Sequence, residues 1–154
     1  MVVEGWTEAV YWGFIRSALR KAWQKFPNRY KTLALAKVER GKYSCNECKE
    51  IFSAKEVVVD HIVPCGSLRC FEDLAEFCRR LFCTMMGLQV LCKTCHQTKT
   101  LHERGMTDDD IALAQFRKLS ASMQRMALGD LNVRNPGVNK DERERQFREL
   151  SKDE

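Results

Sequence analysis

The sequence predicts an α+β fold that is mostly helical, with a small strand-containing centre and a structural four-cysteine zinc site. Three observations support this prediction. Apolar residues recur at helical spacing near the start of the chain and again after residue 70. Short β-branched segments gather between residues 42 and 64. Two C-x-x-C pairs, Cys45/Cys48 and Cys92/Cys95, lie on either side of residues 49–91, and paired thiols at this spacing are typical zinc ligands.

Two helices are expected over residues 7–40. Thr7 followed by Glu8 is a helix start, and Pro27 ends the first helix. Its apolar stripe is predicted to contain Val10, Tyr11, Phe14, Ile15, Ala18, Leu19, Ala22, Trp23 and Phe26. The other face carries Arg16, Arg20, Lys21 and Lys25, which either lie along phosphates or form a solvated face. The second helix is expected to run from Asn28 as its cap to Gly41, a residue suited to the turn after a helix.

The middle of the chain is expected to contain strands and two further helices. The stretch GKYSCNECKEIFSAKEVVVDHIVP predicts two strands around a metal-binding turn. Residues 70–83 have the apolar spacing of a helix. The short apolar segment 88–91 leads into CKTCHQTKTLHERG, which predicts a turn and a helix that ends at Gly105.

A last predicted helix covers residues 107–127, with Thr107 as its cap and three aspartates in its first turn, where the helix dipole favours negative charge. Residues 129–154 are expected to be a linker and a charged tail that forms a solvated or frayed helix. We therefore expect one domain over residues 1–128, with a core at 42–105, followed by this tail.

Composition limits the compartment and the partners. A chain of 154 residues that is 44% hydrophobic can bury one ordinary core. No apolar run approaches the roughly 20 residues needed to cross a bilayer, and MVVEG does not open a signal peptide, so we expect no membrane association and a cytoplasmic protein. The net charge of +5 suits a polyanionic partner but also an ordinary soluble protein.

The eight cysteines fall into two groups. Cys45, Cys48, Cys92 and Cys95 form the two C-x-x-C pairs that predict the zinc site, for which a redox dithiol is the alternative. The 43 residues between the pairs exceed a zinc-ribbon gap, so a folded segment is expected between them. The unpaired Cys65, Cys70, Cys78 and Cys83 are interpreted as small buried hydrophobic residues, because cytosolic thiols stay reduced.

The order CNEC, VVVDHIVP, LQVLCKTCHQTKT resembles the HNH nuclease family, in particular its small zinc-stabilised members from bacteriophages, over roughly residues 10–105. This resemblance implies a ββα-metal core in which two strands and a helix hold one divalent ion. It implies that His61 is the general base, that Asp60 is a metal ligand, and that His96 is the second protein ligand. Such a site takes Mg²⁺, and its imidazole also suits Mn²⁺, Co²⁺ or Ni²⁺.

One position departs from the family pattern. Many members have asparagine before LQ-x-LC, where this chain has Gly87, and that asparagine steadies the loop of the base histidine. Gln89 or a backbone carbonyl is the expected substitute. Lys99 and Arg69 are candidate phosphate contacts, and His102 is interpreted as a surface or substrate-adjacent residue.

The resemblance implies a metal-dependent DNA endonuclease of loose sequence preference that leaves 5′-phosphate and 3′-hydroxyl ends by nicking or double-strand cutting. In the phage proteins the gene often lies beside those for terminase and portal, which implies a role in genome packaging inside the host cytoplasm. The alternative is a zinc-stabilised DNA-binding or packaging-accessory module without activity. Arg16, Arg20, Arg69 and Lys99 are the predicted DNA-binding residues in either case.

Overall fold

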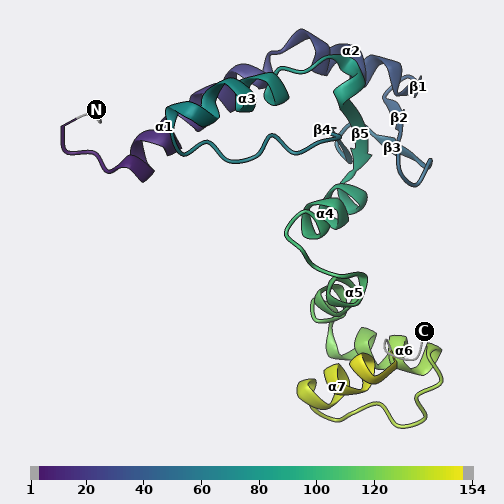
Figure 1. Cartoon of the computed structure of the whole chain (residues 1–154). Helices are drawn as coiled ribbons and strands as arrows, with labels where there is room; N and C mark the ends of the chain where they lie inside the picture. Colours follow the sequence, from purple (N-terminus) through teal and green to yellow (C-terminus); the bar gives the residue numbers. More distant parts are fainter. Residues whose placement is uncertain (1–3, 151–154) are drawn as a thin grey trace. The chain divides into compact units, whose positions relative to one another are not determined.

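A computed structural model describes residues 4–150 of the chain (Figure 1). Its helices are α1 (Glu8–Gln24), α2 (Pro27–Leu35), α3 (Phe71–Leu81), α4 (Lys93–His102), α5 (Asp108–Phe116), α6 (Ala121–Asp130) and α7 (Lys140–Leu150), with a short 3₁₀ turn at Met85–Gly87. Its strands are β1 (Lys37–Glu39), β2 (Lys42–Ser44), β3 (Ile51–Ser53), β4 (Val57–His61) and β5 (Leu88–Cys92). The α+β prediction is confirmed.

The chain divides into two compact units, residues 1–97 and 98–154, and each is described by itself. Unit 1 contains both sheets, one with strand order β1-β2-β3 and one formed by β4 and β5. In the second sheet the two strands are antiparallel, with Val57 opposite Cys92 and His61 opposite Leu88. β5 runs directly into α4, so two strands followed by a helix form the centre of this part of the chain.

The core of unit 1 lies between α1, α3 and one face of the β4–β5 sheet. Burial alternates along β4, with Val57, Val59 and His61 buried and the residues between them half-buried. The buried residues Trp12, Trp23, Val57, Val59, Leu68, Phe77, Leu81, Leu88 and Val90 form one hydrophobic cluster. A smaller cluster on the cysteine side contains Cys45, Leu91 and Cys92, with Val58 packed against it. The alternation of the strand therefore directs His61 and Asp60 to opposite faces.

The first helix begins as predicted, because the Thr7 hydroxyl accepts a hydrogen bond from the Val10 amide. Its buried face differs in detail. Trp12 is buried, whereas Val10 and Phe14, both predicted to be apolar-stripe residues, are more than half exposed.

The second helix is shorter than predicted. It begins at Pro27, ends at Leu35, and residues 37–39 form β1 against β2. The predicted extension of the helix to residue 40 was wrong. The Ala36 carbonyl accepts a hydrogen bond from the Ser44 amide at 2.9 Å, and this bond starts the pairing of residues 37–39 with β2.

Unit 2 contains α5, α6 and α7. The predicted helix 107–127 is broken in two, because Ser120 caps a new helix by accepting a hydrogen bond from the Met123 amide. Residues 140–150, expected to be a solvated or frayed helix, do form a helix, α7, but it packs within unit 2 instead of being solvated. Arg143 is only 5% exposed, and the Phe147 ring stacks on Phe116 with centroids 4.4 Å apart. No helix within residues 4–150 has the length and apolar character needed to cross a membrane.

Candidate functional site

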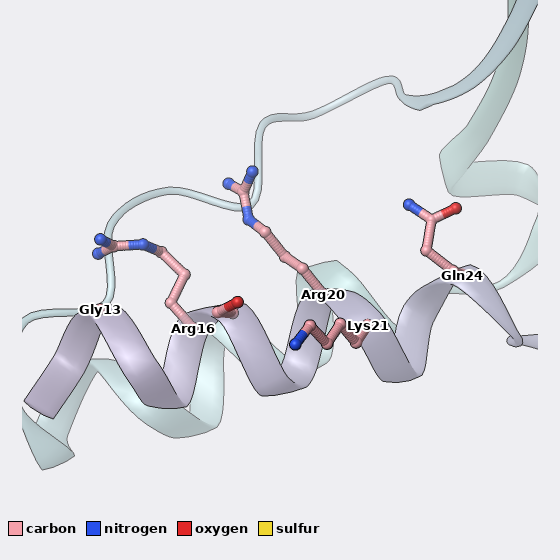
Figure 2. Close-up of a pocket in the computed structure, with 6 residues that line it drawn as sticks. Gly13, Arg16, Arg20, Lys21 and Gln24 are labelled. Carbon is pink, nitrogen blue, oxygen red and sulfur yellow. The ribbon is translucent and has the colours of Figure 1, made fainter.

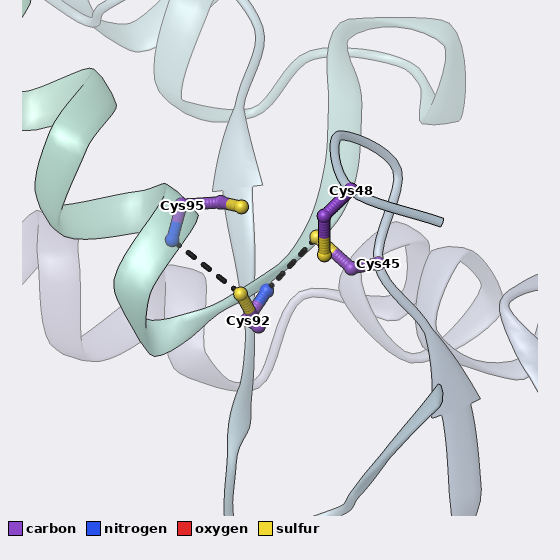
Figure 3. Close-up of side chains that lie close together, drawn as sticks. All are labelled: Cys45, Cys48, Cys92 and Cys95. Carbon is purple, nitrogen blue, oxygen red and sulfur yellow. Dashed lines mark hydrogen bonds between the residues drawn. The ribbon is translucent and has the colours of Figure 1, made fainter. Parts of the chain in front are cut away.

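Four cysteine thiols lie together beside the β4–β5 sheet (Figure 3). Cys45 and Cys48 come from the turn between β2 and β3, whereas Cys92 and Cys95 come from the junction of β5 and α4. All four sulfur atoms lie within 4.8 Å of one another. Zinc bound by four thiolates at about 2.3 Å keeps neighbouring sulfurs about 3.8 Å apart, so the cluster fits a zinc site with small adjustments.

Local hydrogen bonds hold the first cysteine turn against β5. The Asn46 amide donates to the Val90 carbonyl at 2.7 Å, and the Val90 amide donates to the Asn46 side chain at 2.9 Å. Lys49 adopts a left-handed backbone with φ of 64°, which closes the C-x-x-C turn. The amide of Cys92 donates to the Cys45 sulfur at 3.3 Å, so a direct hydrogen bond joins the two halves of the cluster.

The thiols of the cluster differ in acidity. Burial opposes ionisation of Cys45, but the backbone amides of Cys92, Cys48 and Glu47 lower its pKa to about 7. Burial and, to a smaller extent, the neighbouring thiols of Cys92, Cys45 and Cys48 raise the pKa of Cys95 to about 12. One thiolate, that of Cys45, therefore forms readily, whereas Cys48 and Cys95 resist ionisation. A divalent cation offsets this resistance, which is the chemistry of a four-thiolate site.

Asp60 and His96 lie close together at the end of the β4–β5 sheet. His96 is in the first half of α4, and its Nε2 lies 3.7 Å from the Asp60 Oδ1. Gln89, opposite Asp60 in the sheet, donates to the Asp60 Oδ2 at 3.4 Å. Two ligand atoms 3.7 Å apart can share one ion at about 2.1 Å from each. The side chains are 18% and 41% exposed for Asp60 and His96, so solvent and a ligand can reach them.

His61 points to the other face of β4 and is only 9% exposed. Its Nε2 lies 3.0 Å from the Leu81 carbonyl at the end of α3. A carbonyl only accepts, so Nε2 carries the hydrogen and Nδ1 has the lone pair in the neutral ring. The Trp23 ring lies against the imidazole with centroids 4.8 Å apart, and the Arg29 guanidinium lies 5.5 Å from the Trp23 centroid.

Sequence reasoning did not find these supports of His61. Trp23 belongs to the apolar stripe of α1, and no sequence signal separates it from the other apolar residues there. The Leu81 carbonyl is a backbone group 20 residues away, so no side-chain pattern marks it. A backbone carbonyl was expected as one substitute for the missing asparagine, whereas the other candidate, Gln89, contacts Asp60.

The structure gives a steric reason for Gly87. A Cβ at this position would lie 2.8 Å from the Cys83 sulfur, too close for any side chain without movement of its neighbour. The Gly87 carbonyl also accepts a hydrogen bond from the Ile62 amide, directly after His61. The chain therefore packs its backbone closely at Gly87, directly beside the residues that follow His61.

The predicted phosphate contacts are spread over several elements. Arg16 and Arg20 line one pocket on α1, and Arg69 lies in the loop before α3, where it lines a smaller pocket with Tyr11 and Phe71. Lys99 pairs with Glu103 in unit 2. His102 lies 3.2 Å from Asp108, also in unit 2, as expected of a surface residue.

The four unpaired cysteines are not fully buried. Cys65, Cys70, Cys78 and Cys83 are all half-buried rather than core residues. Cys65 and Cys83 pack against the main cluster, and burial raises the pKa of both thiols. Their interpretation as small apolar residues is therefore only partly right.

Comparison of the chain with models of protein families, with curated proteins and with solved structures finds no match.

Proposed function

We propose that this chain is a metal-dependent endonuclease of the HNH type that hydrolyses phosphodiester bonds in DNA. The observation that carries the proposal is the pair Asp60 and His96, with ligand atoms 3.7 Å apart, beside a histidine whose tautomer is fixed. The pair supplies an oxygen and a nitrogen ligand for one ion. His61, the residue directly after Asp60, supplies the general base.

Asp60 and His96 would hold one Mg²⁺, Mn²⁺, Co²⁺ or Ni²⁺ ion, with water and phosphate oxygens completing its shell. The bound ion would neutralise charge on the phosphate and on the leaving oxygen. Gln89 keeps the Asp60 carboxylate oriented through its 3.4 Å contact. This role of Gln89 differs from the support of His61 expected from the sequence.

His61 would act as the general base. Its Nδ1 takes a proton from water while the water oxygen bonds to phosphorus, and the bond from phosphorus to the 3′ oxygen breaks. The 3′ oxygen takes a proton from solvent, which leaves 5′-phosphate and 3′-hydroxyl ends. The Leu81 carbonyl, 3.0 Å from Nε2, stabilises the positive imidazolium that forms.

The cysteine cluster would hold a structural Zn²⁺ ion. Four thiolates close the coordination shell, so no open position remains for a substrate. The ion would join the turn that precedes β3 to the start of α4, and so fix His96 relative to Asp60. A reducing compartment such as the cytoplasm would keep these thiols free to bind it.

The test of the metal site is cleavage of supercoiled plasmid with Mg²⁺ or Mn²⁺ by the zinc-loaded protein. Asp60→Ala and His96→Ala are expected to lower the nicking rate at least about 100-fold. His102→Ala is the matched control, because His102 is an exposed histidine on the same helix that pairs with Asp108 instead. Equal rates for all four proteins would reject the metal site, as would a loss in His102→Ala equal to that in His96→Ala.

One observation favours the second candidate, a zinc-stabilised DNA-binding or packaging-accessory module without activity. His61 is about nine-tenths buried, as a structural histidine would be. This candidate predicts DNA binding without cleavage in any of the four metals, and a stimulation of terminase or portal function in a reconstituted packaging reaction. Metal-dependent nicking that the Asp60→Ala variant lacks would exclude it.

A further inference from the structure

A basic groove lies along one side of α1, away from the buried face of that helix. Its lining consists of Gly13, Arg16, Ser17, Arg20, Lys21 and Gln24, and its volume is about 390 Å³ (Figure 2). The lining has three cationic side chains, two neutral polar ones and no acidic one. None of the salt bridges found within residues 4–150 involves its three cations.

The groove is attached to the loop that leaves the strand of Asp60 and His61. Arg16 donates to the Leu68 carbonyl at 3.3 Å, and the Leu68 side chain is fully buried in the core. Figure 2 shows Arg16 and Arg20 extending from the same side of α1 toward this loop. At its other end the groove reaches Gln24, and the ring of the adjacent Trp23 lies 4.8 Å from the His61 ring, measured between centroids. The groove therefore lies on the helix that contacts His61, the residue next to Asp60.

We propose that this groove binds the phosphate backbone of one nucleic-acid strand beside the phosphate that is cleaved. The inference rests on the proposed endonuclease function and adds the surface that holds the substrate. Arg, Lys, Ser and Gln are the side chains that contact phosphates and sugars in protein–DNA complexes. Arg16 to Gln24 spans about 12 Å of helix, the axial length of roughly three to four nucleotides of one strand.

The chemistry of the lining favours a phosphate backbone over an acidic polypeptide. Protein interfaces usually have an apolar or aromatic centre. The groove has no apolar side chain in its lining. Contacts made only by cations and small polar groups suit a regular row of phosphates, and they position a strand without reading its sequence.

Arg16 and the other two cations have different parts in this surface. Arg16 is half-buried and its hydrogen bond to Leu68 fixes the loop, so it is both a structural residue and a phosphate contact. Arg20 and Lys21 are exposed, and their removal leaves this loop contact intact. They are therefore the residues to substitute.

The experiment measures DNA binding by fluorescence anisotropy at several salt concentrations, in zinc-loaded His61→Ala protein with no other divalent ion. Each phosphate contact contributes about 0.9 to the slope of log K against log salt concentration for a duplex. Arg20→Gln/Lys21→Gln is expected to lower this slope by about 1.8. Lys118→Gln/Arg125→Gln, which removes two exposed cations of unit 2, is the control with the same net charge and should leave the slope unchanged.

A second pair of variants keeps the groove proposal testable if Arg20→Gln/Lys21→Gln does not fold. Gln24→Glu adds one negative charge to the groove with no change in side-chain size, and is expected to weaken binding about 10-fold at low salt. Gln115→Glu on the exposed face of α5 is its control. Zinc content checks that unit 1 of each protein is folded, and circular dichroism with thermal unfolding checks the whole chain, including the controls in unit 2.

An unchanged slope in Arg20→Gln/Lys21→Gln would overturn the inference, and so would an equal change in its control. Displacement of the DNA by a poly-glutamate peptide at an equal or lower charge concentration would assign the groove to an acidic protein instead. Cleavage is measured separately with wild-type protein. If DNA binding depends on Arg20 and Lys21 but wild type does not nick DNA with Mg²⁺ or Mn²⁺, the endonuclease function is rejected and the groove remains a DNA-binding surface. If wild type nicks DNA but binding does not depend on Arg20 and Lys21, the groove proposal is rejected and the endonuclease function stands.

Discussion

At the scale of single residues, adjacent positions on one strand have opposite environments. Asp60 is half-buried and faces His96, whereas His61 is buried against Trp23. The period of two in a β-strand produces this separation, so the Asp60 carboxylate lies near His96 and the His61 imidazole lies in the core. Local sequence motifs marked the Asp-His pair and the later His96, and the structure places Asp60 and His96 close together, whereas their catalytic roles stay predictions. No motif marked the carbonyl that fixes the His61 tautomer, because any residue type could provide it.

Trp23 is predicted to be a positioning residue for His61. Trp23→Leu should lower the nicking rate constant about 10-fold with little change in KM, because the imidazole loses the ring it packs against. Trp12→Leu is the matched control, since Trp12 is a buried tryptophan of the same helix and the same cluster. Both variants should lose about 2–3 kcal/mol of unfolding free energy. Single-turnover kinetics below the melting temperature of both would show whether only Trp23→Leu is slow.

Gly87 is predicted to be required by the close approach of Cys83. Gly87→Ala should cost about 1–3 kcal/mol, because the new methyl would lie 2.8 Å from the Cys83 sulfur. Chemical denaturation of the single variants and of Gly87→Ala/Cys83→Ala measures the coupling. Most of the loss should be recovered in the double variant. Additive losses would mean that the contact with Cys83 is not the cause.

At the scale of elements, the sequence signals located most helices and strands but misjudged where helices end. Thr7 and Thr107 were correct helix starts because their side chains cap the helix locally. Residues 37–39 were predicted to be helical but form β1, because they pair with β2. This pairing is a contact between two segments, which local sequence spacing does not show. The break before Ser120 follows from a local cap that the long apolar pattern concealed.

The helix α7 shows why composition misled the prediction for the tail. Its charged sequence suggested solvation, yet the Arg143 guanidinium donates to the Gln124 side chain and to the carbonyls of Gly137 and Val138. Gln124 in turn donates to the Phe116 carbonyl at 3.0 Å. A buried charge is stable when hydrogen bonds satisfy it, and the sequence does not reveal such partners.

Arg143→Ala is predicted to destabilise unit 2. It would leave the Gln124 oxygen and two carbonyls without their donor, at a cost of about 2–4 kcal/mol. Hydrogen exchange should show faster opening of α5, α6 and α7. Arg145→Ala, an exposed arginine two residues later, should leave these rates unchanged. A similar effect of both substitutions would contradict the role of the buried guanidinium.

At the scale of the whole molecule, the four cysteines are the feature that the sequence predicted best. Their spacing indicated a metal site, and the structure brings all four sulfurs together. The site also explains how Asp60 and His96, 36 residues apart, come within 3.7 Å. The division into two units after residue 97 had no clear signal, because α4 continues across it without a break in the sequence pattern.

Zinc is predicted to stabilise unit 1. The purified protein should contain about one zinc ion per chain, and Cys45→Ser should abolish tight binding, while Cys70→Ser, outside the cluster, should not. Removal of zinc with a strong chelator should speed hydrogen exchange in β4 and β5 and leave α5, α6 and α7 protected. Elemental analysis and exchange measurements check both results. Less than one ion per folded chain, or unchanged protection of β4 after chelation, would contradict the site.

The most direct test of the central claim is the single-turnover rate at which zinc-loaded His61→Ala nicks a supercoiled plasmid in Mg²⁺, compared with wild type. A general base contributes about 100-fold or more, so the variant should be slower by at least that factor, with unchanged zinc content and unchanged plasmid binding. The products of the wild-type reaction should be ends that DNA ligase can rejoin. Equal nicking rates for the two proteins, or no metal-dependent nicking by wild type, would contradict the claim.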